Sequence, residues 1–378
     1  MGSVYKYQTQ KGRRWEARYR KPDGKPARKA GFLVRADAQA FLDAIEVDKR
    51  QGSYIAPSAG RVTIDDLGRK WLVAHKIAVK ASTYRTDESA WRIHVQPQWG
   101  ARTVASIEHD EIQDWVAELA AEKSATTVSR CFGVLANILD AAVRSKRVGT
   151  NAARGVKLPR RSKTRRPYLT HAQVESLATQ ARGRADFIRF LAYTGLRWGE
   201  ATGLRVRDVN LATRRVNVEE NAVEVGYEIV VGAPKSHERR TVAYPAFLDD
   251  GVAAACKGKP ADALVWSDDG KKYLRAGNRQ SGWFVGAVRR AQAGDDTFPY
   301  LSPHGLRHTA ASLAISAGAN PKVVQTMLGH ASAAMTLDTY ADLFPDDLDV
   351  VIVALDRQRT EQLSGNAAVT DLRRNDVS

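Results

Sequence analysis

Basic side chains recur in the second half of the chain at positions where they could act together on a phosphate ester. Arg197 follows Thr-Gly-Leu and precedes Trp-Gly-Glu, so it stands where one apolar helix ends and the next begins. His304 and Arg307 are three residues apart behind Ser302-Pro303, a pair typical of a helix start. A helix N-terminus binds anions through its N–H groups, and arginine adds a bidentate fork. These segments indicate a phosphate site.

Three further groups could supply proton transfer and a nucleophile. Lys235 stands between two predicted strands, where a lysine can reach into a groove as a mobile acid. His330 directly follows Gly329, which is expected to end a short helix begun by Asn320-Pro321. Tyr340 lies on the next predicted helix.

Each of these features also has a plainer interpretation when taken alone. Arg197 and Glu200 are more often a structural ion pair, Lys235 an exposed turn residue, and Tyr340 a core residue at helical spacing. His308 lies about 100° further round its helix than Arg307. We interpret His308 as a packing or supporting residue.

The ordered set resembles the active site of the tyrosine recombinase (phage integrase) family, which contains this series in this order. The resemblance covers residues 168–345 through the motifs TGLRWGE, PKS, HGLRHT, LGH and TxxxY. The six implied catalytic residues are Arg197, Lys235, His304, Arg307, His330 and Tyr340. Residues 1–155 resemble the family in layout alone, that of lambda-like integrases with an N-terminal arm-binding domain.

Two positions depart from the family pattern. Many members place the tyrosine nine residues after the last histidine, whereas Tyr340 is ten residues after His330. Many also have a histidine two residues beyond the tyrosine, where this chain has Asp342. Neither difference removes a reacting group. The longer spacing concerns how the helix places the tyrosine in the active site.

The resemblance implies that Tyr340 attacks phosphorus and forms a covalent 3′-phosphotyrosyl link. Fixed cations then do the work for which many nucleases use two metal ions, so no metal, ATP or other cofactor is expected. Arg197 and Arg307 stabilise the charge on phosphorus, with His304 and His330 as further donors. Lys235 is the candidate general acid for the 5′-oxygen, and His304 is the expected base for the phenol.

The sequence predicts a multidomain α+β protein with three domains, and the third domain must position these residues. Residues 1–57 are expected to form a small three-stranded sheet backed by a helix from 35 to 52, an arm-type DNA-binding domain. A generic protein-interaction module is the alternative for this sheet. Residues 62–155 read as an all-helical domain, with Thr63 and Ser106 as helix caps, and the resemblance implies that it is a core-binding (SAM-like) domain.

Residues 165–378 are predicted to form the catalytic domain, mostly helical with a small antiparallel sheet. Three strands are expected between 214 and 244, and helices near 281–293, 303–317, 321–328 and 335–344. The cation-rich segment 154–167 is either a solvated tether or a basic strap along a phosphate backbone.

Charge and composition point to nucleic acid and exclude other classes. The 378 residues carry a net charge of +16, and residues 1–35 hold 11 Lys or Arg against 2 Asp or Glu. The two cysteines exclude a disulfide framework or a Cys-based zinc module, and each is expected to be a buried thiol. No apolar stretch suits a membrane span or signal peptide, so we expect no membrane partner and a cytoplasmic location on DNA.

The sequence therefore predicts a phage integrase that integrates and excises DNA at attachment sites. The expected partners are double-stranded DNA with core and arm sites and three further copies in a homotetramer. The family often also uses a host DNA-bending protein and an excisionase. A Xer-like or transposon recombinase, a type IB topoisomerase and a non-catalytic DNA-binding regulator are the alternatives. The motifs do not specify the attachment-site sequences, because base readout depends on side-chain placement.

Overall fold

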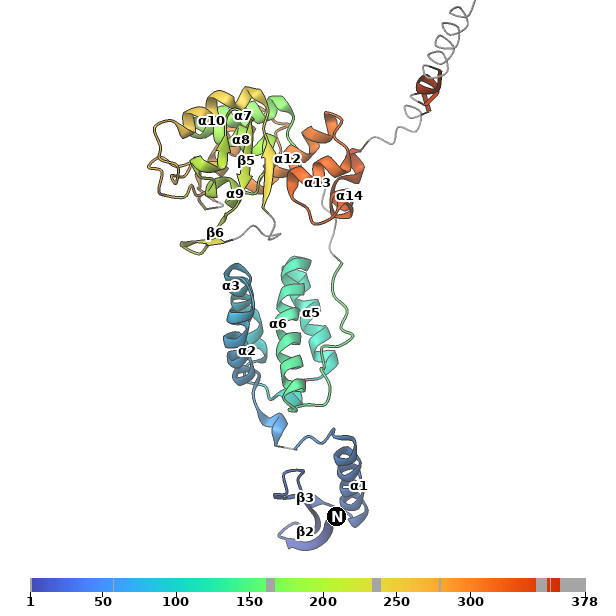
Figure 1. The fold of residues 1–378 in the computed structure, drawn as a ribbon. Coiled ribbons are helices and arrows are strands. Elements are labelled where there is room, and N and C mark those ends of the chain that lie inside the picture. Colours follow the sequence, from blue (N-terminus) through green and yellow to red (C-terminus); the bar gives the residue numbers. More distant parts are fainter. Residues whose placement is uncertain are drawn as a thin grey trace, which may run out of the picture. The chain divides into compact units, whose positions relative to one another are not determined.

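The computed structural model describes residues 2–56, 58–160, 167–232, 239–278, 280–344, 352–353 and 355–360 (Figure 1). Contacts divide the chain into two units, Met1–Thr164 and Arg165–Ser378. Helices dominate both units, and small antiparallel sheets accompany them, as expected for a multidomain α+β protein. No helix among these residues is long and apolar enough to cross a membrane.

The first unit begins with the predicted sheet and its helix. The strands β1 (Ser3–Thr9), β2 (Gly12–Arg20) and β3 (Pro26–Phe32) are antiparallel in that order, and α1 (Arg35–Gln51) follows. Ala17 and Tyr19 of β2 pack with Ala38, Leu42 and Ile45 of α1 in a small apolar core. The helix ends at Gly52 in the left-handed conformation, as its sequence predicts.

Helices make up the rest of the first unit. They are α2 (Ile64–Ala78), α3 (Ala81–Ala90), a π-helical turn at Trp91–Val95, α4 (Gln96–Trp99), α5 (His109–Glu122) and α6 (Ala125–Arg144). Thr63 caps α2 by accepting a hydrogen bond from the Asp66 N–H, as predicted. Ser106 does not cap α5, because the chain makes a 3₁₀ turn at Val104–Ser106 and α5 begins three residues later.

In the second unit, short helices surround the strands. The helices are α7 (His171–Gln180), α8 (Ala185–Thr194), α9 (Trp198–Gly203), α10 (Asp249–Cys256), α11 (Trp283–Gly294), α12 (Pro303–Ser316), α13 (Pro321–Leu328) and α14 (Ala333–Tyr340). Figure 1 shows α12, α13 and α14 grouped on one side of this unit. The last helix starts two residues earlier than predicted and ends at Tyr340, followed by a 3₁₀ turn at Ala341–Leu343.

The strands of this unit differ from the prediction in number and pairing. The strands are β4 (Val209–Asn210), β5 (Arg215–Val218), β6 (Asn221–Val225), β7 (Glu228–Gly232) and β8 (Arg240–Ala243). The run 214–223, expected to be one strand, is split between β5 of the sheet β4-β5-β8 and β6 of the hairpin β6-β7. The break allows β6 to pack on α9, where a Cβ on Gly199 would lie 2.4 Å from the Ala222 carbonyl oxygen.

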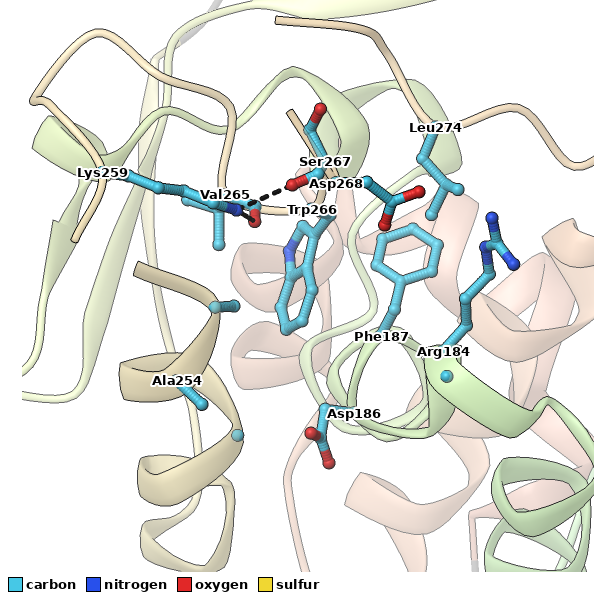
Figure 2. Close-up of a pocket in the computed structure, with 13 residues that line it drawn as sticks. Arg184, Asp186, Phe187, Ala254, Lys259, Val265, Trp266, Ser267, Asp268 and Leu274 are labelled. Atoms are coloured by element: carbon cyan, nitrogen blue, oxygen red, sulfur yellow. Dashed lines mark hydrogen bonds between the residues drawn. The ribbon is translucent and has the colours of Figure 1, made fainter. Parts of the chain in front are cut away.

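Each unit buries one of the two cysteines, and the second unit contains a cavity. Cys131 of the first unit and Cys256 of the second are free and buried, as expected. A cavity of about 210 Å³ lies between α8, α10 and the segment 265–268 (Figure 2). The Lys259 ammonium beside it donates to the carbonyls of Leu264, Val265 and Ser267. None of the five predicted catalytic residues that the structure describes lines this cavity.

Candidate active site

The turn between α8 and α9 determines the position of Arg197. The apolar face of α8 is buried, and the helix ends at Gly195, whose φ of 65° is a left-handed conformation that glycine adopts readily. A Cβ at Gly195 would lie 2.7 Å from Leu328 Cδ2, so the turn packs tightly against the end of α13. Arg197 then occupies the N-cap position of α9, as its sequence context predicts.

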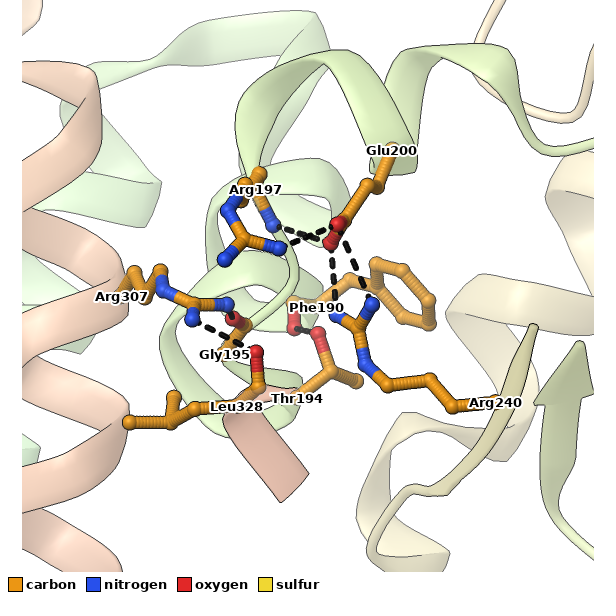
Figure 3. Close-up of polar contacts among 8 residues, drawn as sticks. All are labelled: Phe190, Thr194, Gly195, Arg197, Glu200, Arg240, Arg307 and Leu328. Carbon is orange, nitrogen blue, oxygen red and sulfur yellow. Dashed lines mark hydrogen bonds and ion pairs between the residues drawn. The ribbon is translucent and has the colours of Figure 1, made fainter. Parts of the chain in front are cut away.

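Arg197 forms the structural ion pair that its spacing from Glu200 suggests, within a larger charged group (Figure 3). Its Nη1 donates to Glu200 Oε1 at 2.7 Å, and its backbone N–H donates to Oε2 at 2.9 Å. Arg240 of β8 binds the same carboxylate through Nη1 at 3.1 Å and Nη2 at 2.6 Å. Burial alone raises the pKa of Glu200, but the bonds and charges of the two arginines outweigh it and lower the pKa to about 2.

Arg307 joins two turns that come from distant parts of the sequence. Its Nη1 donates to the Gly195 carbonyl at 2.8 Å and its Nη2 to the Leu328 carbonyl at 2.6 Å. The residue is 3% exposed. Burial and the neighbouring charge of Arg197 lower the pKa of Arg307 to about 9, so the guanidinium is still charged at neutral pH.

His330 lies just beyond the end of α13, which stops at Gly329 as predicted, and Gly329 adopts the left-handed conformation. Its Nδ1 is 2.9 Å from Thr336 Oγ1, and its ring is parallel to that of Tyr340 with centroids 6.4 Å apart. Burial, followed by the charges of Arg307, Arg197 and Arg240, lowers the pKa of His330 to about 4. The imidazole is therefore neutral at pH 7 and donates or accepts hydrogen bonds as a neutral group.

Tyr340 contacts His308, which the sequence indicated to be a packing or supporting residue. Its hydroxyl is 2.7 Å from Nδ1 of His308 on α12, and its side chain is 1% exposed. The His304 and His308 rings meet edge to face with centroids 4.9 Å apart. The signal that could have identified His308 is its i+4 spacing from His304, which puts both histidines on one side of α12.

Five of the six predicted catalytic residues converge in the second unit. Contacts connect Arg197, His304, Arg307, His330 and Tyr340 through the turn at Gly195, the end of α13 and the α12–α14 packing. Lys235 lies outside the described residues. His308, interpreted from the sequence as a packing or supporting residue, joins the group through Tyr340. Arg240 joins it without having been assigned a role from the sequence, and it stands five residues after Lys235.

Comparison with known proteins places both units among DNA recombination proteins. A model described as Phage integrase family matches residues 167–346, and one described as Phage integrase, N-terminal SAM-like domain, matches residues 63–120. Together they cover more than half of the chain.

Two relatives illustrate the range of the similarity. The transposase from transposon Tn916 of Enterococcus faecalis is 31% identical over 212 residues, 51% of this chain and 52% of that protein. The chain thus spans about half the length of this relative. The integrase of Mycobacterium phage L5 is 26% identical over 292 residues, 74% of this chain and 75% of that protein.

A solved structure shares the fold. The Tn1549 transposon integrase in complex with a circular intermediate DNA superposes with a TM-score of 0.65 at 21% sequence identity. The match covers 78% of this chain and 99% of that one.

Proposed function

Because the chain belongs to the phage integrase family of tyrosine recombinases, we propose that it is a site-specific DNA recombinase. It integrates and excises DNA at attachment sites by cutting and rejoining strands through a 3′-phosphotyrosyl link. The observation that carries this proposal is the convergence of two arginines and three histidines around the buried Tyr340.

The arginines suit a phosphodiester whose non-bridging oxygens gain charge during displacement. Arg307 is fixed by two backbone carbonyls, and Glu200 holds Arg197, so neither cation must reorganise as the charge develops. A guanidinium group can bind two phosphate oxygens at once, and it remains charged at neutral pH. His330 is neutral there and contributes a hydrogen bond rather than a charge.

Two proton transfers accompany the displacement. As the bond from Tyr340 Oη to phosphorus forms, the phenol proton passes to Nδ1 of His308. We assign this step to His308, in place of His304, because His308 makes the 2.7 Å hydrogen bond to the hydroxyl. Lys235 protonates the 5′-oxygen as its bond to phosphorus breaks. Attack by another strand's 5′-hydroxyl reverses these steps and restores the tyrosine.

The three predicted domains would divide the work on DNA. Residues 165–378 carry out the strand transfer, residues 62–155 hold the core site, and residues 1–57 bind arm-type sites. The SAM-like match at 63–120 supports the second of these roles, and the 11-to-2 charge ratio of residues 1–35 supports the third. The active form is a homotetramer on double-stranded DNA in the bacterial cytoplasm, assisted by a host DNA-bending protein and an excisionase.

A transposon recombinase is the second candidate function. The 31% identity to the Tn916 transposase favours it. The chemistry of both candidates is the same, and only the mobile DNA differs.

Covalent trapping tests the proposed chemistry. The full chain would be mixed in EDTA with supercoiled DNA carrying the region that flanks its own gene, and quenched with detergent. A protein–DNA adduct should form with the wild type and be absent with Tyr340→Phe, which loses one hydroxyl and keeps its DNA affinity. Tyr300→Phe is the matched control, since Tyr300 is 58% exposed and precedes α12.

Two results would overturn the proposal. An adduct that still forms with Tyr340→Phe would refute the nucleophile, and a strict magnesium requirement would refute catalysis by fixed cations. If the wild type gives no adduct, a nicked substrate that traps the cleaved strand separates a missing accessory factor from a catalytically silent protein.

A further inference from the structure

We propose that Arg240 is a positioning residue that fixes Arg197 and the turn before His330, and that it does not itself bind the phosphate. The proposal rests on the recombinase function proposed above. Arg240 lies at the first position of β8, where its backbone pairs with Val218 of β5. The sheet therefore holds its Cα while its side chain extends toward α9 and α13.

The first line of evidence is the shared carboxylate. Glu200 is fully buried, and both of its oxygens bind Arg240 while one side-chain bond goes to Arg197 (Figure 3). A buried carboxylate held in this way has one stable orientation, because turning it would leave a buried guanidinium unpaired. The orientation of Glu200 in turn sets the position of the Arg197 guanidinium.

The second line of evidence is packing beneath His330. A Cβ built on Gly329 would lie 2.9 Å from Cδ and Nε of Arg240, so the guanidinium end of Arg240 lies directly against this glycine. Nε of Arg240 is buried and has no hydrogen-bond partner among the described residues. Arg240 thus supports the left-handed turn that immediately precedes His330.

Arg197 and Arg240 differ in how far their side chains are exposed, and this difference indicates different roles. The Arg240 side chain is 9% exposed and both of its terminal nitrogens are bound to Glu200. The Arg197 side chain is 22% exposed, and among the described residues Glu200 engages only its Nη1. Arg197 therefore keeps Nη2 without a bond to Glu200, whereas both terminal nitrogens of Arg240 are bound to that carboxylate and its charge is already paired. Arg307 differs from Arg240 because its partners are two neutral carbonyls, which leave its charge for a phosphate.

Arg240→Met and Arg240→Lys, made in the full chain, test this assignment. Methionine keeps the packing stem and loses the charge, and lysine keeps the charge but cannot bind bidentately. For Arg240→Met we expect single-turnover cleavage of a nicked substrate to slow by about 100-fold, as when a catalytic group is misplaced by about 1 Å. DNA affinity should change by less than about 3-fold because no phosphate contact is lost. Arg240→Lys should recover part of the rate.

Two further measurements separate positioning from loss of fold or of function. The His330 ring titration, followed by NMR without DNA, should move upward from a pKa of about 4 in Arg240→Met, since a neighbouring positive charge is gone. Arg214→Met is the matched control, because Arg214 pairs with Asp249 at 2.8 Å and is 49% exposed. It should leave cleavage and the His330 titration unchanged.

Several outcomes would overturn the proposal. Wild-type cleavage by Arg240→Met would do so, as would a loss of DNA affinity equal to the loss of rate, which would make Arg240 a phosphate ligand. An unchanged His330 titration in a folded variant would refute the contact with the His330 turn. If wild-type protein cleaves no DNA, the recombinase proposal fails, while the titration still tests the position of Arg240.

Discussion

At the scale of single residues, the site is a cluster of three arginines around one buried carboxylate and two helix ends. Glu200 binds Arg197 and Arg240, and Arg307 binds the Gly195 and Leu328 carbonyls. The low pKa values of His330 and Arg307 reflect burial together with this excess of positive charge. A phosphodiester anion entering the site would relieve the repulsion. Burial and the same repulsion keep His330 neutral, so the arginines provide the charge and His330 provides a directed hydrogen bond.

His308→Asn tests the proton acceptor at this scale. Asparagine can keep a hydrogen bond to Tyr340 Oη but cannot take its proton at neutral pH. We expect single-turnover cleavage to fall by about 100-fold or more, within the usual contribution of a general base. His171→Asn is a matched control, since His171 Nδ1 lies 2.7 Å from the Tyr193 hydroxyl on α8. Equal rates for His308→Asn and wild type would remove His308 from the mechanism.

Glu200→Gln tests the buried carboxylate through its pH dependence. The pKa of Glu200 is about 2 in the folded chain against 4.5 ordinarily, which corresponds to about 3 kcal/mol of stability. A depressed carboxylate pKa stabilises the fold fully above about pH 5, and the contribution is lost as the pH falls toward 2. Urea unfolding should show the variant less stable at pH 7, with the difference shrinking below pH 5.

The matched control for this measurement is Glu228→Gln, which changes an exposed residue of β7. Its urea midpoint should follow that of the wild type across the pH range. A constant difference in stability between Glu200→Gln and wild type from pH 7 to pH 3 would contradict the low pKa of Glu200.

At the scale of elements, the site depends on where helices stop. α8 ends at Gly195, α13 ends at Gly329, and Arg307 on α12 binds the carbonyls of Gly195 and Leu328 at these two ends. Carbonyls at a helix C-terminus lack partners within the helix and carry partial negative charge, so a buried guanidinium satisfies them. Since Tyr340 is 1% exposed, we expect DNA binding to open the packing around it before its hydroxyl meets a phosphate.

Gly195→Ala tests how closely these helix ends must meet. The left-handed φ costs alanine about 1 kcal/mol, and the 2.7 Å approach to Leu328 Cδ2 adds an overpacking cost of about 1–3 kcal/mol. Gly258→Ala is the control, because φ there is +71° and no atom lies within 4 Å of the added Cβ. Thermal unfolding should show the larger loss for Gly195→Ala, with slower cleavage. Equal losses of stability in the two variants would mean that the turn accommodates the added Cβ without overpacking.

At the scale of the whole molecule, charge is distributed unevenly along the chain. Residues 1–35 hold 11 Lys or Arg against 2 Asp or Glu, whereas residues 341–378 hold 4 against 8. Each phosphate contact by a cation releases counterions, so affinity for DNA should fall steeply with salt. The N-terminal sheet should account for much of that dependence on DNA that carries arm sites.

Deletion of residues 1–57 tests this division of labour. The shortened chain should bind arm-site DNA more weakly and with a shallower dependence of log affinity on log salt, since several phosphate contacts are lost. Fluorescence anisotropy at several salt concentrations measures both quantities. Core-site DNA is the control, and covalent trapping on it should persist. Unchanged arm-site binding by the shortened chain would contradict the role of the sheet.

The sequence by itself predicted the candidate reacting groups and the local elements that carry them. The helix starts at Thr63 and Asn320 and the helix ends at Gly52 and Gly329 are local signals, formed by residues a few positions apart, and each is present as predicted. The ordered motifs predicted the family for the same reason, because each motif is a short segment readable in isolation.

The tertiary structure alone decided which of these groups touch. Arg240 binds Glu200 across 40 residues, and His308 meets Tyr340 across 32. The run 214–223 splits into two strands because β5 and β6 join different partners, β8 and β7. Such contacts depend on the packing of distant segments, which neither helical periodicity nor a capping residue encodes. The sequence therefore supplied the chemistry, and packing decided which histidine meets the tyrosine and which arginine supports Arg197.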